Sequence, residues 1–107
     1  MSSFDKLYEV IKDRQANPAE GSYTCYLFEK GVDKILKKCG EECAEVIIAA
    51  KGGEKSELEN EICDLIYHLF VLMADRGVAL SDIERILDER AQKIGNLKTF
   101  NVVDKDS

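Results

Sequence analysis

The chain contains 107 residues, and its 21 Asp and Glu residues outnumber its 15 Lys and Arg residues, which gives a formal net charge of −6 at pH 7. This length predicts a single domain, residues 1–107, that can bury a core of its own. The acidic balance argues against a nucleic-acid partner, because a duplex binder normally presents a basic stripe. The most apolar stretch, 65–74, is too short to span a bilayer, so we expect no membrane insertion.

The N-terminus and the cysteines both indicate the cytoplasm. The first residues lack the apolar run of a secretory signal, and Cys25, Cys39, Cys43 and Cys63 contain no CxxC pair. We therefore expect four reduced, buried thiols. A zinc site is not expected, because His68 is the only histidine.

The N-terminal part of the chain is predicted to contain two helical segments. Apolar residues recur at helical spacing from residue 4 to about residue 14, with Ser2 and Ser3 as candidate caps. Residues 15–22 carry the only proline and are expected to form a loop. Residues 22–30 are expected to form a short helix or an extended turn.

The centre of the chain is predicted to be a helical hairpin. Its first helix covers 32–51 and stops at Gly52–Gly53, since glycine tolerates the left-handed conformation of a helix end. A capping box that starts at Ser56 opens the second helix, which runs to about residue 76. Apolar stripes on the two helices are expected to face the core. They lie at positions 32, 36, 39, 43, 46 and 50 of the first helix and at Leu58, Ile62, Leu65, Leu69 and Leu72 of the second, where Ile66, Phe70 and Met73 widen the stripe.

A last helix and a tail complete the predicted fold. A second capping box starts at Ser81, and Gly95 is expected to end the helix that follows. Residues from about 96 to 107 are expected to form a flexible tail. The inward side chains of this helix are predicted to be Ile83, Ile86, Leu87 and Ile94. The fold class is therefore all-α, a helical hairpin bundle of about four to five helices.

Four carboxylates have a spacing that can bring them together across the hairpin. Glu42 and Glu45 are three residues apart on the first helix, and so are Glu61 and Asp64 on the second, so that each pair shares a face. Residues at one level of an antiparallel hairpin have a constant index sum. Residues 42 and 64 share this sum with residues 45 and 61, for a turn centred on Gly53. Helix rotation then decides whether the pairs face each other.

Close carboxylates repel one another unless a cation holds them. Mg²⁺ suits such a site, because it takes oxygen ligands and keeps positions for water and for phosphates. The alternative is a solvated acidic face neutralised by pairs such as Lys38–Glu42. A di-iron centre is a weaker alternative, since it needs two Glu-x-x-His units and the chain has only His68.

Basic residues precede these acids on the same helix. Lys34, Lys38, Glu41 and Glu45 fall on one side, next to Glu42. Lysines suit phosphate oxygens and carboxylates suit the metal, so this order is typical of a site for a metal–polyphosphate substrate. Ion pairing within the helix is an alternative that needs no substrate.

Several motifs resemble a known family. Glu41-Glu42-x-x-Glu45 followed by Glu61-x-x-Asp64 resembles the EExxE…ExxD signature of the all-α nucleotide pyrophosphohydrolase (MazG-like) superfamily. The surrounding motifs SYTCYLFEKG, DKILKKCGEE and DLIYH look like those of the phosphoribosyl-ATP pyrophosphohydrolase family of histidine biosynthesis. The resemblance covers about residues 4–98, nearly the whole chain.

The resemblance implies Mg²⁺-dependent hydrolysis of phosphoribosyl-ATP to phosphoribosyl-AMP and pyrophosphate, the second step of histidine biosynthesis, by a homodimer that completes the core. It places metal ligands at Glu42, Glu45, Glu61 and Asp64. Glu41 is then either a further ligand or the catalytic group that positions the attacking water. The remaining candidates are expected to bind the substrate, with Lys30, Lys34 and Lys38 at the phosphates, and Tyr23, Thr24 and His68 in the family motifs. His68 can equally be a satisfied core residue.

Two other functions fit the same residues. A housekeeping hydrolase of damaged or unusual nucleoside triphosphates would share the metal site and differ in substrate. A non-catalytic helical dimerisation module would bury the same apolar stripes but bind neither Mg²⁺ nor nucleotide.

Overall fold

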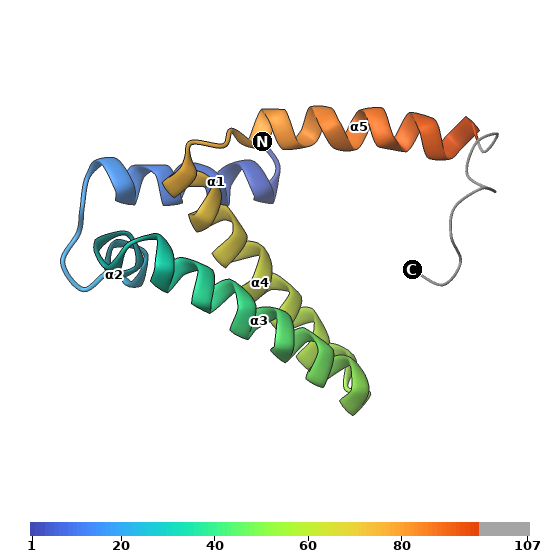
Figure 1. The fold of residues 1–107 in the computed structure, drawn as a ribbon, viewed down its shortest axis with the longest axis horizontal. Helices are drawn as coiled ribbons and strands as arrows, with labels where there is room; N and C mark the ends of the chain where they lie inside the picture. The colour runs from blue at the N-terminus through green and yellow to red at the C-terminus, as the bar shows by residue number, and fades with distance from the viewer. Residues whose placement is uncertain (97–107) are drawn as a thin grey trace.

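The computed structural model describes residues 1–96, which form five helices (Figure 1). They are α1 (Ser3–Ala16), α2 (Tyr23–Lys30), α3 (Val32–Gly52), α4 (Lys55–Arg76) and α5 (Leu80–Asn96). No strand occurs in this part of the chain, so the all-α class is confirmed. Within it, no helix is long and apolar enough to cross a membrane. Apart from Asn96, the predicted tail lies outside the described residues.

α3 and α4 form the predicted antiparallel hairpin (Figure 1). Gly53 ends α3 in the left-handed conformation, with φ 85°, which costs little for glycine. Glu54 follows in an extended conformation, and its carbonyl accepts a hydrogen bond from the Leu58 amide at 3.1 Å. α4 therefore begins at Lys55, one residue before Ser56. The capping box predicted there is wrong, because the reversal at Gly53 already sets the start of the helix.

The capping box predicted at Ser81 is wrong for a similar reason. α5 begins at Leu80, and the amides of Asp82 and Ile83 both donate to the carbonyl of Ala79, at 3.1 and 3.4 Å. A backbone carbonyl thus takes the place of the predicted side-chain cap. Ser2, in contrast, caps α1 as predicted, in a reciprocal pair with Asp5.

The core lies at the end of the hairpin that α1 and α2 cover. The rings of Tyr8 in α1 and Phe70 in α4 meet edge to face, with centroids 5.6 Å apart. The buried side chains come from all four helices and are Ile11, Leu27, Ile35, Cys39, Phe70, Val71 and Ala74. α1 and α2 therefore fix the hairpin at one end only.

The buried line of α3 differs from the predicted apolar stripe. Ile35, Cys39, Glu42 and Ala49 are buried, and only Cys39 also belongs to the stripe. The predicted and the buried rows of residues have similar spacing along α3. A prediction from apolar residues alone leaves out the buried glutamate, so it selects the neighbouring row. A similar displacement occurs in α4, where the buried residues are His68, Phe70, Val71 and Ala74. Of these, only Phe70 belongs to the predicted stripe, as one of the residues that widen it.

Burial is also less complete than predicted elsewhere. All four cysteines are free, but only Cys39 is buried, and Cys43 and Cys63 are exposed. α5 projects away from the hairpin (Figure 1), so that Leu87 and Ile94 are exposed although an inward position is predicted for both. The far end of the hairpin carries Ile47 and Ile48, which are 65% and 69% exposed.

Two neighbouring side chains in α1 test the placement of the core. Ile11 is fully buried, whereas Val10 is 53% exposed. We expect Ile11→Ala to lower the free energy of unfolding by about 2–5 kcal/mol and Val10→Ala to change it by less than about 0.5 kcal/mol. Urea unfolding followed by circular dichroism measures both, and equal losses for the two variants would contradict this core.

Candidate active site

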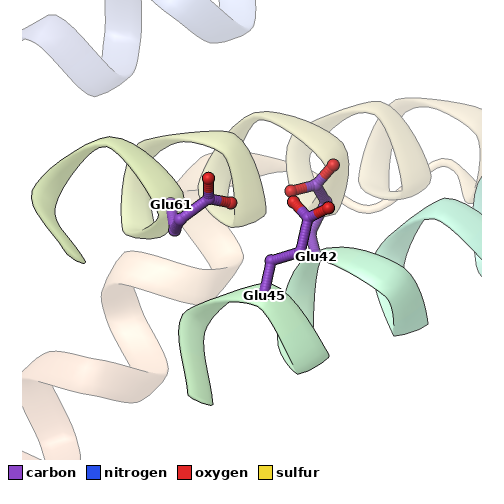
Figure 2. A group of neighbouring side chains, drawn as sticks. All are labelled: Glu42, Glu45 and Glu61. Atoms are coloured by element: carbon purple, nitrogen blue, oxygen red, sulfur yellow. The ribbon is translucent and has the colours of Figure 1, made fainter. Parts of the chain in front are cut away.

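Three of the four predicted carboxylates meet between α3 and α4. One carboxylate oxygen from each of Glu42, Glu45 and Glu61 lies within 4.8 Å of the other two. Figure 2 shows these side chains gathered from the two facing helices. Glu42 is buried, at 7% exposure, while Glu61 is partly buried and Glu45 is exposed. The predicted pairing of residues 45 and 61 at one level of the hairpin is therefore confirmed. We call these three residues the acidic cluster.

Asp64 lies at the edge of the acidic cluster rather than within it. Its side chain is exposed, and it is not among the three residues whose oxygens lie within 4.8 Å of one another. Its charge nevertheless raises the pKa of both Glu42 and Glu61. The charge of the fourth predicted ligand thus acts on two of the other three, Glu42 and Glu61.

Hydrogen bonding, burial and repulsion raise the pKa of two members of the acidic cluster. A hydrogen bond with Glu45, together with burial and the charges of Glu45, Asp64 and Glu42, raises the pKa of Glu61 to about 7. Burial, followed by the hydrogen bond and charge of Glu45, also raises the pKa of Glu42, and Lys38 opposes this rise. A cation bound among these carboxylates would oppose both rises.

Two oxygens of the acidic cluster have no partner. Oε2 of Glu42 and Oε2 of Glu61 are buried, and neither makes a hydrogen bond within the described residues. A buried polar atom without a partner costs free energy. A set made only of carboxylates suits a hard cation such as Mg²⁺ better than zinc or copper. The residues present therefore fit a magnesium ion.

The open side of the acidic cluster adjoins a recess. The recess has a volume of about 480 Å³, and Glu45 and Glu61 line it together with Ile48, Asn60 and Glu57. Because the recess is open to solvent, water and a ligand can reach these carboxylates.

Lys38 lies beside the acidic cluster, and Glu41 lies beside Lys38. The Lys38 Nζ is 3.5 Å from Oε1 of Glu41 and 3.9 Å from Oε1 of Glu42. Burial lowers the pKa of Lys38, but the charges of Tyr23, Glu41 and Glu42 and a hydrogen bond to Glu41 raise it more, so that the net shift is upward. The ion pair predicted between Lys38 and Glu42 is therefore confirmed. Glu41 is exposed and lies outside the acidic cluster.

His68 connects α2 to the site. Its Nδ1 is 2.8 Å from the backbone carbonyl of Asp64, and its Nε2 is 3.1 Å from the Tyr23 hydroxyl. Because a carbonyl oxygen only accepts, Nδ1 carries the proton, and Nε2 accepts from Tyr23. Both ring nitrogens of this buried side chain are engaged, as in a satisfied core residue. Substrate contact by His68 stays a prediction.

Two tyrosines that sequence reasoning missed flank Tyr23. The Tyr67 ring stacks on Tyr23 with centroids 6.3 Å apart, and the Tyr26 ring does so at 6.0 Å. The Tyr67 hydroxyl also forms a hydrogen bond with Oγ1 of Thr24. The spacing of Tyr26, three residues after Tyr23 on one helix, is the sequence signal for this stack. Substrate contact by Tyr23 and Thr24 stays a prediction.

Lys30 and Lys34 lie at Tyr26 and not at the acidic cluster. Their Nζ atoms are 5.8 and 6.0 Å from the centroid of the Tyr26 ring, within the range of a cation–π contact. Among residues 1–96, neither lysine forms an ion pair. The three lysines predicted at the phosphates therefore fall into two groups, with Lys38 alone beside the carboxylates.

An all-α hairpin that gathers carboxylates beside a lysine has the residues expected of a metal-dependent phosphohydrolase. Comparison with known proteins narrows this class. The family model described as phosphoribosyl-ATP pyrophosphohydrolase matches residues 4–91, and the chain belongs to this family.

Named relatives agree with the family. The phosphoribosyl-ATP pyrophosphatase of Clostridium acetobutylicum is 61% identical over 93 residues, which cover 87% of this chain and 84% of the relative. The protein of the same name from Bacillus cereus is 48% identical over 103 residues, 96% of each chain. The histidine biosynthesis bifunctional protein HisIE of Caldanaerobacter subterraneus subsp. tengcongensis is 57% identical over 89 residues, which cover 83% of this chain and 43% of that protein.

The acidic cluster predicts how stability depends on pH when no metal is present. The pKa of Glu61 is about 7 in the folded protein and about 4.5 ordinarily, so the folded state binds more protons between these values. The free energy of unfolding should therefore fall as the pH rises through this window. Urea unfolding in the presence of a chelator, at several pH values across the window, measures the fall. Glu61→Gln removes the titrating group and should make the fall shallower, and an equally steep fall in that variant would argue against the assignment.

Proposed function

We propose that this chain hydrolyses phosphoribosyl-ATP to phosphoribosyl-AMP and pyrophosphate at a magnesium centre held by Glu42, Glu45, Glu61 and Asp64. The reaction is that of the family, so the chain is a hydrolase of histidine biosynthesis. The observation that best supports the metal is the pair of unpartnered buried oxygens on Glu42 and Glu61. Asp64 joins the proposed ligands because its charge acts on both of these residues.

A bound Mg²⁺ would supply charge neutralisation at the phosphate oxygens and a lowered pKa for bound water. In the proposed reaction, water attacks the α-phosphorus, a new phosphorus–oxygen bond forms, and the bond to the β-phosphate oxygen breaks to release pyrophosphate. Lys38 is the proposed group that offsets negative charge on the phosphates, because its Nζ lies 3.9 Å from Glu42.

Glu41 is the proposed group that positions the attacking water and accepts its proton. It is exposed, it lies outside the acidic cluster, and Lys38 holds its carboxylate at 3.5 Å. A carboxylate next to the metal ligands but separate from them can act as a general base. A role as a further ligand is the alternative, and Glu41→Gln separates the two roles, since only a ligand change weakens Mg²⁺ binding.

The substrate is the first point to test. The protein is expected to release pyrophosphate from phosphoribosyl-ATP at a higher kcat/KM than from any member of a panel of deoxynucleoside triphosphates. A preference for the panel would favour a housekeeping hydrolase of nucleoside triphosphates. Absence of turnover on every nucleotide would favour a dimerisation module.

Removal of one proposed ligand should abolish the Mg²⁺-dependent reaction. Glu42→Gln keeps the shape of the side chain but removes a ligand charge, and we expect turnover to fall by about 100-fold or more. Circular dichroism should show unchanged helicity. Glu59→Gln is the matched control on α4, because Glu59 is exposed and lies outside the acidic cluster. Full turnover in Glu42→Gln would rule out its role as a ligand.

We also propose that two copies of the chain pair through their hairpins. The core covers one end of the hairpin, and the other end exposes Ile47, Ile48 and Ile62. Two such hairpins packed together would form a four-helix bundle and bury these side chains. A second copy of the chain, as the resemblance implies, would therefore cover this apolar surface.

A charge placed on this apolar surface should separate the copies. Ile47→Lys would put an ammonium group into the proposed interface, where burial without a partner is costly. Analytical ultracentrifugation should show a dimer for the unchanged protein and a shift to monomer for this variant. Val10→Lys, a similarly exposed apolar position on α1, is the control and should stay dimeric. A monomeric unchanged protein would exclude the proposed dimer.

A further inference from the structure

Lys30 and Lys34 form a cationic pair that the proposed reaction at the carboxylates does not use. Both ammonium groups lie within about 6 Å of the Tyr26 ring centroid. Glu29 and Asp33 are their exposed neighbours in sequence, yet among residues 1–96 no carboxylate forms an ion pair with either lysine. Two cations that lie at the same ring and have no acidic ion-pair partner can bind an anion.

Stacked rings connect these two lysines to Asp64, at the edge of the acidic cluster. Tyr26 stacks on Tyr23, and the Tyr23 hydroxyl bonds to His68, which holds the backbone of Asp64. Along α3, Lys34, Lys38 and Glu42 follow at intervals of four residues, on one side of the helix. The rise of an α-helix places residue 34 about 16 Å from residue 45. A chain of contacts therefore leads from the two lysines through the exposed tyrosine rings and His68 to Asp64, beside the carboxylates.

The substrate has the same order of groups. Phosphoribosyl-ATP carries a triphosphate at one end and the monophosphate of its phosphoribosyl group at the other, with the purine base between them. ATP lacks the monophosphate of the phosphoribosyl group. An enzyme that acts on phosphoribosyl-ATP must distinguish it from ATP, and the additional phosphate is the strongest charge by which it can do so.

We propose that Lys30 and Lys34 bind the monophosphate of the phosphoribosyl group and so select phosphoribosyl-ATP over ATP, while Tyr23 and Tyr26 lie along the base. This assignment rests on the proposed function, because it places the triphosphate at Lys38 and the acidic cluster. Loss of the two lysines then weakens binding of the phosphoribosyl monophosphate without changing the groups that act at the α-phosphorus.

A recess beside the tyrosines gives the phosphoribosyl group room. It has a volume of about 620 Å³ and lies between α2 and the loop of residues 18–22, with Tyr23, Tyr26, Glu20 and Glu29 in its lining. Carboxylates repel a phosphate but accept hydrogen bonds from ribose hydroxyl groups. The phosphate therefore belongs at the lysines and the ribose in the recess.

The product provides a direct binding test. Phosphoribosyl-AMP keeps the phosphate of the phosphoribosyl group, and AMP lacks it. Isothermal titration with each compound, in the absence of metal, therefore measures the contact between this phosphate and the two lysines separately from catalysis. The unchanged protein should bind phosphoribosyl-AMP more tightly than AMP. Lys30→Gln/Lys34→Gln should weaken phosphoribosyl-AMP binding by about 10- to 100-fold, the size expected for two charge-assisted contacts, and change AMP binding by less than about 3-fold.

A matched double variant controls for total charge. Lys37 and Lys51 are exposed on the same helix, and Lys37→Gln/Lys51→Gln removes the same two charges away from Tyr26. This control should keep the preference for phosphoribosyl-AMP. In steady-state assays, the Lys30/Lys34 variant should show a raised KM for phosphoribosyl-ATP and a kcat close to that of the unchanged protein.

The outcomes separate this proposal from the proposed function. If the unchanged protein hydrolyses phosphoribosyl-ATP but the Lys30/Lys34 variant keeps its full preference for phosphoribosyl-AMP over AMP, the lysine assignment is wrong and the proposed function stands. An equal loss of binding for both compounds, or an equal loss in the control variant, also overturns the assignment. If the unchanged protein does not hydrolyse phosphoribosyl-ATP, the proposed function itself fails.

Discussion

The repulsion among the carboxylates of Glu42, Glu45 and Glu61 is the constraint on which the rest of the structure depends. Glu42 occupies the buried line of α3, where an apolar side chain would avoid the cost of burying a charge. The hairpin nevertheless holds its oxygen within 4.8 Å of two others. Burial raises the pKa of Glu42, a hydrogen bond with Glu45 raises that of Glu61, and the repulsion raises both further. A proton can relieve this repulsion, and in the proposed function a divalent cation does so instead.

The distribution of packing along the hairpin explains how such a site is maintained. α1 and α2 fix one end through a small core, and the acidic cluster lies beyond the region that they cover. α2 also positions Tyr23 against His68, whose Nδ1 donates a hydrogen bond to the backbone carbonyl of Asp64. The apolar far end of the hairpin has no cover within residues 1–96. Pairing of two hairpins would support the acidic cluster from that side as well.

The sequence predicts the order of the helices, and which residues of α3 and α4 lie opposite one another, much better than it predicts the rotation of each helix about its axis. Glycines at 52 and 53 locate the turn, and the constant index sum correctly brings Glu45 and Glu61 together. Helix rotation depends on which line of α3 packs against α4, and a count of apolar residues cannot include the buried Glu42 in that line. Ser56 and Ser81 are not caps because backbone geometry at Gly53 and Ala79 has already started each helix.

The central claim is that the acidic cluster holds the metal of the reaction, and crystals grown with Mn²⁺ in place of Mg²⁺ test it most directly. Mn²⁺ takes the same oxygen ligands and can be located by its anomalous scattering. The account predicts an anomalous peak about 2.0–2.3 Å from carboxylate oxygens of Glu42, Glu45 and Glu61. A crystal that contains bound Mn²⁺ only at other residues, or none at saturating concentration, would contradict it.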